Sequence, residues 1–78
     1  MTNETTVSAR ERVTGDVAAA LGIGPGELTD DTNLLDAGLD SVRIMALIEK
    51  WRRAGHEDLD LPVLAEDPVL GSWIALLE

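Results

Sequence analysis

The spacing of the apolar residues restricts the fold of this chain more than any other feature. Between positions 44 and 51, apolar side chains recur at intervals of three and four residues: Ile44, Leu47, Ile48 and Trp51. The same spacing returns near the C-terminus at Leu70, Trp73, Ile74 and Leu77. These intervals place side chains on one face of an α-helix, whereas a half-buried strand requires alternation. No segment alternates, so the spacing predicts an all-α fold.

The first predicted helix covers residues 7–21. Ser8 and Glu11 have the spacing of a capping box, in which each side chain accepts a hydrogen bond from the other residue's backbone N–H. The apolar stripe of this helix is Val13, Val17 and Leu21, with Ala20 beside it. Residues 1–6 are polar, and we expect a disordered N-terminus there, followed by a single domain over residues 7–78.

A long loop follows, from Gly22 to about Asp40. It carries five acidic residues and no basic one: Glu27, Asp30, Asp31, Asp36 and Asp40. It also contains the leucines Leu28, Leu34, Leu35 and Leu39. An unstructured loop of this length is unusual in a small domain. We therefore expect the leucines to hold the loop against the core, with a short helical turn near residues 34–37.

Three further helices complete the predicted fold. The second begins at Asp40-Ser41 and ends before Gly55, and a short third helix covers residues 61–66. We expect Asp67 to be the N-cap of the last helix and Pro68 its first residue. The result is a small four-helix bundle of three main helices plus one short helix, with the two tryptophans in its core.

Size and composition exclude several kinds of function. The chain has 78 residues, no cysteine and one histidine, His56. It is one domain at most, without disulfides or a thiolate metal site. His56 lies beyond the far end of the helix that Ser41 begins, about 20 Å away, so the two cannot form a catalytic pair. The acidic residues of the loop lack the spacing of a calcium-binding EF-hand. We expect neither catalytic residues nor a metal site.

The charge is strongly negative. Fifteen acidic and six basic residues give a net charge of −9. This balance argues against binding to nucleic acid or to an anionic membrane, and it favours partners with basic surfaces. The first residues contain no apolar segment, so we expect no signal peptide, and no apolar run is long enough to span a membrane. We expect a cytoplasmic monomer.

Ser41 is the residue that the sequence favours as a site of covalent modification. It follows Asp40 at an exposed helix start, where backbone N–H groups and the helix dipole favour a phosphate ester on its hydroxyl. The alternative is that Asp40 and Ser41 only cap the helix, since both residue types are preferred there.

A resemblance adds to this interpretation. Residues 34–43, LLDAGLDSVR, are similar to the attachment motif of phosphopantetheine-bearing carrier proteins. Further similarities point to the aryl carrier proteins of nonribosomal peptide synthesis, above all to the carrier domain fused to isochorismatase. They are Met45-Ala46-Leu47, Trp51-Arg52, Asp60-Leu61, Leu64-Ala65, Asp67-Pro68 and Ser72-Trp73. The chain departs from this pattern at Leu61 and Ile74, where relatives often carry aromatic residues, which leaves the fold intact but affects the identity of its partners.

The resemblance implies an acyl carrier protein fold and a free-standing aryl carrier protein that is not an enzyme. A phosphopantetheinyl transferase would attach 4′-phosphopantetheine to Ser41, beside Asp40. An aryl-acid adenylating enzyme would load an aromatic acid as a thioester, for delivery to a condensation or cyclisation domain of a nonribosomal peptide synthetase. Two alternatives are an acyl or aminoacyl carrier for a different cargo and an acidic helical interaction module.

The resemblance also implies a partner surface on the second and third helices. Its expected members are Val42, Arg43, Met45, Leu61 and Ala65. Small exposed apolar groups suit contacts that must form and release quickly.

Overall fold

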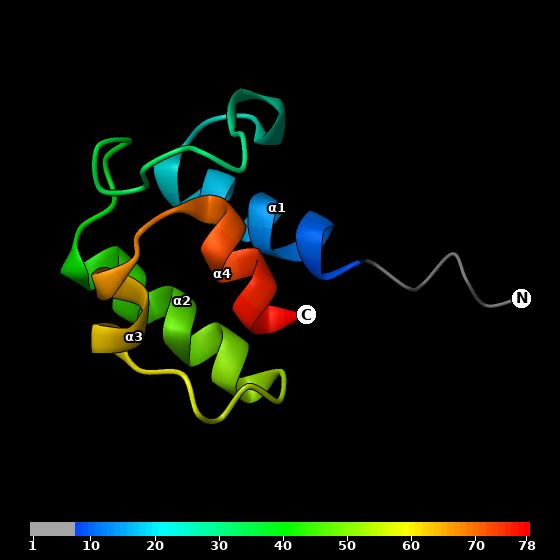
Figure 1. The fold of residues 1–78 in the computed structure, drawn as a ribbon, viewed down its shortest axis with the longest axis vertical. Helices are drawn as coiled ribbons and strands as arrows, with labels where there is room; N and C mark the ends of the chain where they lie inside the picture. Colours follow the sequence, from blue (N-terminus) through cyan, green and yellow to red (C-terminus); the bar gives the residue numbers. More distant parts are fainter. Residues whose placement is uncertain (1–7) are drawn as a thin grey trace, which may run out of the picture.

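A computed structural model describes residues 8–78 and shows an all-helical domain. Its elements are α1 (Ala9–Leu21), the 3₁₀ turn η2 (Pro25–Glu27), α2 (Ser41–Arg53), α3 (Leu61–Glu66) and α4 (Leu70–Leu77) (Figure 1). The four α-helices confirm the predicted fold class of three main helices plus one short one. The predicted disordered segment at residues 1–6 lies outside the described residues. Helix α2 runs along one side of the molecule, and α3 lies beside its first turns (Figure 1).

Helix α1 begins as its sequence predicts. The Glu11 N–H donates to Ser8 Oγ at 3.1 Å, and the capping box is complete. Since Ser8 is the cap, the helix itself begins at Ala9. It ends at Gly22, whose φ of 74° lies in the left-handed region that glycine adopts without strain. The buried side chains are Val13, Val17 and Ala18; the predicted stripe residue Leu21 is only partly buried.

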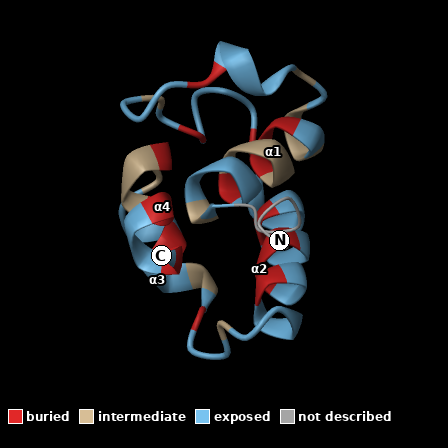
Figure 2. Ribbon diagram, turned by 90° about the vertical axis from the view of Figure 1, so that its right-hand side faces the viewer, coloured by how far each residue is buried: buried red, intermediate tan, exposed pale blue. Residues whose placement is uncertain are grey.

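The core is aliphatic apart from its two tryptophans. All eight stripe residues predicted for α2 and α4 are buried, and the buried faces of the helices turn toward one another (Figure 2). Trp51 and Trp73 meet edge to face, with ring centroids 6.1 Å apart. The Trp73 indole N–H donates to the carbonyls of Leu64 and Asp67, at 3.1 and 3.0 Å. The last helix is therefore tied to the end of α3.

The predicted start of α4 is wrong. The helix begins at Leu70, and neither Asp67 nor Pro68 belongs to it. Its first N–H groups are satisfied by the loop: Leu70 N–H donates to the Thr32 carbonyl at 3.1 Å, and Gly71 N–H to the Asp30 carbonyl at 2.9 Å. Backbone from a distant segment thus replaces the side-chain cap, which helix propensities alone do not predict.

The long loop is held against the core as expected, with one correction. Leu28, Leu34 and Leu39 are buried, but Leu35 is 45% exposed. The predicted helical turn is a hydrogen-bonded turn in which the Ala37 N–H donates to the Asn33 carbonyl at 3.0 Å, and η2 was not predicted.

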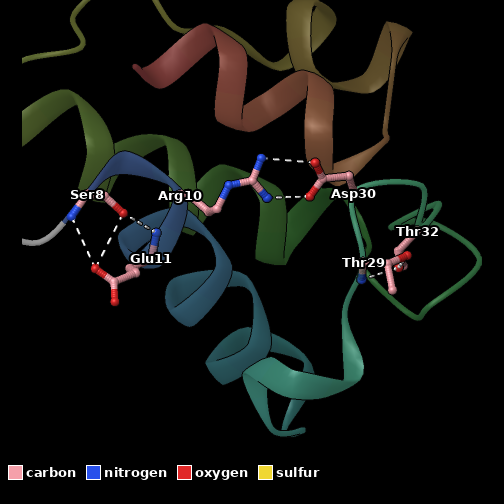
Figure 3. A network of polar contacts seen from close by, with 6 residues as sticks. All are labelled: Ser8, Arg10, Glu11, Thr29, Asp30 and Thr32. Atoms are coloured by element: carbon pink, nitrogen blue, oxygen red, sulfur yellow. Dashed lines mark hydrogen bonds and ion pairs between the residues drawn. The ribbon is translucent and has the colours of Figure 1, made fainter.

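Polar contacts hold the outer side of the loop. The Arg10 guanidinium of α1 forms two parallel hydrogen bonds with the Asp30 carboxylate, one of them at 3.0 Å (Figure 3). Thr29 N–H donates to Thr32 Oγ1 at 2.9 Å within the same loop. The bonds from Arg10 lower the pKa of Asp30 below its ordinary value. The loop is therefore fixed to α1 as well as to α4.

No helix in the described part of the chain has the length and apolar character needed to cross a membrane.

Candidate functional site

Ser41 is the first residue of α2 and is exposed. Asp40 precedes it as the N-cap, and Asp40 Oδ1 accepts a hydrogen bond from the Arg43 N–H at 2.9 Å. The Ser41 hydroxyl has no hydrogen-bond partner among residues 8–78. Capping is thus performed by Asp40, and it leaves the Ser41 hydroxyl available for reaction.

The backbone around Ser41 favours an anion. Asp40 occupies the N–H of Arg43 with its side chain and the N–H of Ile44 with its carbonyl. The N–H groups of Ser41 and Val42 have no acceptor within the described part of the chain. These two donors and the positive end of a 13-residue helix lie beside the hydroxyl. A phosphate ester on Ser41 would therefore be stabilised by hydrogen bonds and by the helix dipole.

The loop determines where Ser41 points. Leu39, two residues earlier, is buried, and its N–H donates to the Leu34 carbonyl at 3.0 Å. Gly38 has a φ of 122°, which a residue with a side chain rarely adopts, and it lies against Leu21 at the end of α1. Leu39 thus holds the chain to the core immediately before α2. The next two residues, Asp40 and Ser41, emerge into solvent.

Asp40 and Arg43 act as one unit at the start of α2. Besides the capping bond, Asp40 Oδ2 lies 3.5 Å from an Arg43 guanidinium nitrogen. Both side chains are more than half exposed, so this ion pair contributes little to stability. The two contacts hold the side chains of the predicted site residues Asp40 and Arg43 together next to Ser41.

The other predicted partner residues divide into exposed and partly buried positions. Val42 is 77% exposed, Met45 is 41% exposed, and Ala65 on α3 is exposed. Leu61 packs partly against the core. Val63 on α3 was not predicted, yet it is 43% exposed. The sequence carries no signal for the exposure of Val63, because successive helix residues point only about 100° apart and neighbours such as Leu47 and Ile48 can both be buried.

The remaining surface offers little catalytic or metal chemistry. No cluster of three metal-ligating side chains occurs among residues 8–78. His56 lines a polar hollow of about 210 Å³ with Leu76, and it follows the C-terminal end of α2 rather than its start. A larger open hollow of about 440 Å³ lies between the first half of α1 and the loop, bordered by Arg10, Leu28, Asp30 and Leu70. The residues of α1 that line this hollow belong to the first half of the helix, whereas Gly38 lies against Leu21 at the helix's other end.

Comparison with known proteins identifies a family. Residues 11–77 match the family described as phosphopantetheine attachment site. The chain is 43% identical over 76 residues to isochorismatase of Bacillus subtilis. It is 52% identical over 48 residues to enterobactin synthase component B of Escherichia coli, and 35% identical over 74 residues to phenyloxazoline synthase MbtB of a Mycobacterium species. These matches confirm the resemblance noted from the sequence. No solved structure gives a significant match.

The matches cover most of this chain but little of the relatives. The first and third alignments include 97% and 95% of the chain, and the second includes 62%. The chain spans 24% of the isochorismatase, 16% of enterobactin synthase component B and 6% of the phenyloxazoline synthase. The similarity therefore concerns one small part of each larger protein. The expectation of a free-standing carrier stays a prediction.

Proposed function

Because the chain belongs to the phosphopantetheine attachment site family, we propose that it is an aryl carrier protein with Ser41 as its attachment residue. Members of this family carry 4′-phosphopantetheine on a serine and are carriers rather than catalysts. The observation that carries the assignment is the exposed Ser41 hydroxyl at the start of α2, with no hydrogen-bond partner in the described structure and with two free N–H groups beside it.

The residues around Ser41 fit a phosphopantetheine group. In the attachment reaction the Ser41 Oγ forms a bond to the phosphorus atom of coenzyme A that bears the pantetheine, loses its proton, and 3′,5′-ADP leaves. The N–H groups of Ser41 and Val42 are placed to donate to the phosphate oxygens of the product. When attached, the group supplies a terminal thiol on which a carboxylic acid is held as a thioester. No residue of this chain needs to act as a catalyst for either event.

Ser8 and Ser72 are poorer candidates for attachment. Ser8 Oγ accepts the Glu11 N–H and is engaged in the capping box. Ser72 lies within α4 and is partly buried against neighbouring residues. Ser8 is the N-cap of α1 but its hydroxyl is engaged, and the N–H groups of Leu70, Gly71 and Ser72 are all paired, so neither serine combines a free hydroxyl with unpaired N–H groups beside it. These contacts favour Ser41 over both.

The aryl cargo is supported by the relatives. The name of phenyloxazoline synthase contains a phenyl group, which is an aryl group, and the similarity to it and to enterobactin synthase component B extends across the region that contains Ser41. We infer that an aryl-acid adenylating enzyme loads the arm. A condensation or cyclisation domain of a nonribosomal peptide synthetase then receives the aryl group. An acyl or aminoacyl cargo is the alternative, and it uses the same Ser41.

Intact-mass measurement tests the attachment residue. The protein is incubated with coenzyme A, Mg²⁺ and a promiscuous phosphopantetheinyl transferase. We expect one phosphopantetheine on the wild type, none on Ser41→Ala, and one on Ser72→Ala as a matched control. Circular dichroism should show that Ser41→Ala stays helical, because Asp40 provides the cap. Labelling of Ser41→Ala would mean that another serine is the acceptor, and an unlabelled wild type would favour the interaction module.

A second measurement identifies the cargo. The labelled protein is incubated with ATP, an adenylating enzyme and either an aryl acid or an amino acid. Mass gain only with aryl acids supports the aryl assignment. Mass gain only with amino acids and amino-acid adenylating enzymes would support the alternative carrier.

We further propose that partners dock on the face formed by α2 and α3. Val42 and Met45 on α2 and Val63 on α3 expose apolar side chains, and the small Ala65 on α3 is exposed as well. Met45→Asp and Ala65→Asp should slow transfer to the condensation partner and leave the helical content unchanged. Leu76→Asp is the control, because Leu76 is 49% exposed but borders the hollow at the other end of α2. Equal transfer rates in all three variants would exclude this face.

A further inference from the structure

The charge of α2 is opposite to that of the rest of the chain. Helix α2 contains Arg43, Lys50, Arg52 and Arg53 against the single acid Glu49, a net charge of +3. The whole chain carries −9, so the other residues together carry −12. Four of the six basic residues therefore lie on the helix that Ser41 begins. The overall charge predicts basic partners, but it does not describe this helix.

The cations of α2 differ in how they are used. Lys50 donates to Asp16 of α1 at 2.8 Å, and Arg43 is paired with Asp40. Arg52 and Arg53 form no ion pair within residues 8–78, although Arg52 Nε donates to the Glu57 carbonyl at 3.4 Å. Both arginines are exposed. Their position in the last turn suits the helix dipole, yet that interaction leaves the guanidinium groups open to a partner.

These two arginines continue the apolar face beside Ser41. Val42, Ala46, Glu49 and Arg53 are spaced by four, three and four residues, and all are exposed. This spacing makes them one ridge on the outer side of the helix. Met45 and Arg52 are seven residues apart, close to two turns, so they lie on a neighbouring ridge. Each ridge is apolar near Ser41 and cationic at its far end. At 1.5 Å per residue, the arginines lie about 16–18 Å from Ser41 along the helix.

We propose that the adenylating enzyme docks along these two ridges and presents carboxylates to Arg52 and Arg53. This inference rests on the proposed function and adds the chemistry of the partner. The apolar ends provide contact area next to the arm. The cationic ends determine how the carrier is oriented, because most of the surrounding surface of this acidic protein repels a carboxylate-bearing patch. The partner's acidic patch then lies about 16–18 Å from the point where the arm is attached.

The test compares charge reversals at different places. Arg53→Glu and Arg12→Glu change the net charge equally, and Arg12 on α1 is exposed and forms no ion pair within the described residues. Each variant is first labelled with coenzyme A and the transferase. Loading by an aryl-acid adenylating enzyme is then measured with ATP and salicylate. We expect Arg53→Glu to raise the KM for the carrier about tenfold with kcat unchanged, and Arg12→Glu to change it less than twofold.

Two further variants separate charge from structure. Arg53→Lys keeps the charge, and its KM should stay within about threefold of the wild type. Arg52→Glu should raise the KM as Arg53→Glu does. Its melting temperature shows whether loss of the hydrogen bond from Arg52 to the Glu57 carbonyl has destabilised the fold. Equal effects of Arg53→Glu and Arg12→Glu would overturn the inference, since only total charge would then matter. No effect of Arg53→Glu would overturn it as well. A wild type that is not labelled would instead overturn the proposed function, and this inference with it.

Discussion

Asp16 connects two helices through a single carboxylate, and its replacement should destabilise the fold measurably. Asp16 Oδ2 accepts the Trp51 indole N–H at 2.9 Å, and Oδ1 accepts Lys50 Nζ at 2.8 Å. Trp51 is only 2% exposed. Asp16→Ala leaves its indole donor buried without a partner, which costs about 1–3 kcal/mol. Loss of the Lys50 pair adds less than about 1 kcal/mol because Lys50 is 63% exposed. The better helix propensity of alanine returns about 0.5 kcal/mol, so the net loss is about 2 kcal/mol.

Asp16→Asn is the matched control. Its amide oxygen can still accept the Trp51 indole N–H, so only the exposed Lys50 pair is lost, and the cost should stay below about 1 kcal/mol. Urea unfolding followed by tryptophan fluorescence and circular dichroism measures both variants. For a domain of this size, 2 kcal/mol corresponds to a melting temperature lower by about 8–16 °C. Equal losses in the two variants would refute the assignment of the effect to the Trp51 hydrogen bond.

Three further predictions follow. Gly71→Ala should lower the free energy of unfolding in urea by about 1–2 kcal/mol, because the added Cβ would lie 3.0 Å from the Asp30 carbonyl oxygen. Gly15→Ala is the control: its Cβ would meet open space, and it should raise the free energy of unfolding by up to about 1 kcal/mol. In Arg10→Gln, a carbon-13 NMR titration should show the pKa of Asp30 rising toward the ordinary 3.8, and an unchanged titration would contradict the pairing. Because the pKa is lowered in the folded state, the pair stabilises the fold at pH values above 3.8, and this contribution is lost as the pH falls through the lowered pKa. Loading should slow as salt rises for every aryl acid that the adenylating enzyme activates; salt-independent rates would exclude electrostatic steering, and strong discrimination between equally activated acids would point to a cargo pocket in this chain.

The helices were predictable because their signals are local. The stripes of α2 and α4, the capping box at Ser8 and the short α3 all depend on residues within one or two turns of each other. The start of α4 was not predictable, because its first N–H groups bond to Thr32 and Asp30, which are about 40 residues distant in the sequence. Which of the two neighbouring leucines, Leu34 and Leu35, is buried was not predictable either. Leu34 is fully buried and donates its N–H to the Pro68 carbonyl at 2.7 Å, a contact between segments that are distant in the sequence.

The candidate site was predicted in part for the same reason. Asp40 and Ser41 are neighbours in the sequence, and their roles as cap and exposed hydroxyl follow from helix chemistry. The cationic part of the docking face, Arg52 and Arg53, could not be predicted, because it depends on which of the other cations form ion pairs. Only the structure shows that Lys50 and Arg10 are engaged by Asp16 and Asp30, and the sequence gives no sign of either partner.

The structure divides the polar side chains of this small protein into two groups with different consequences. Asp16, Asp30 and Asp40 each fix the position of a helix or the loop through hydrogen bonds to other elements or to the start of α2. Ser41 and Arg53 make no such bonds to the described residues and project from the helix that the first group holds in place. A change in the first group should therefore lower the free energy of unfolding, and it should alter loading only through the position of α2. A change in the second group should leave unfolding nearly untouched and act on labelling or on the KM of loading. Measuring unfolding and loading on the same set of variants separates a carrier that presents one serine from a bundle whose surface charges serve stability alone.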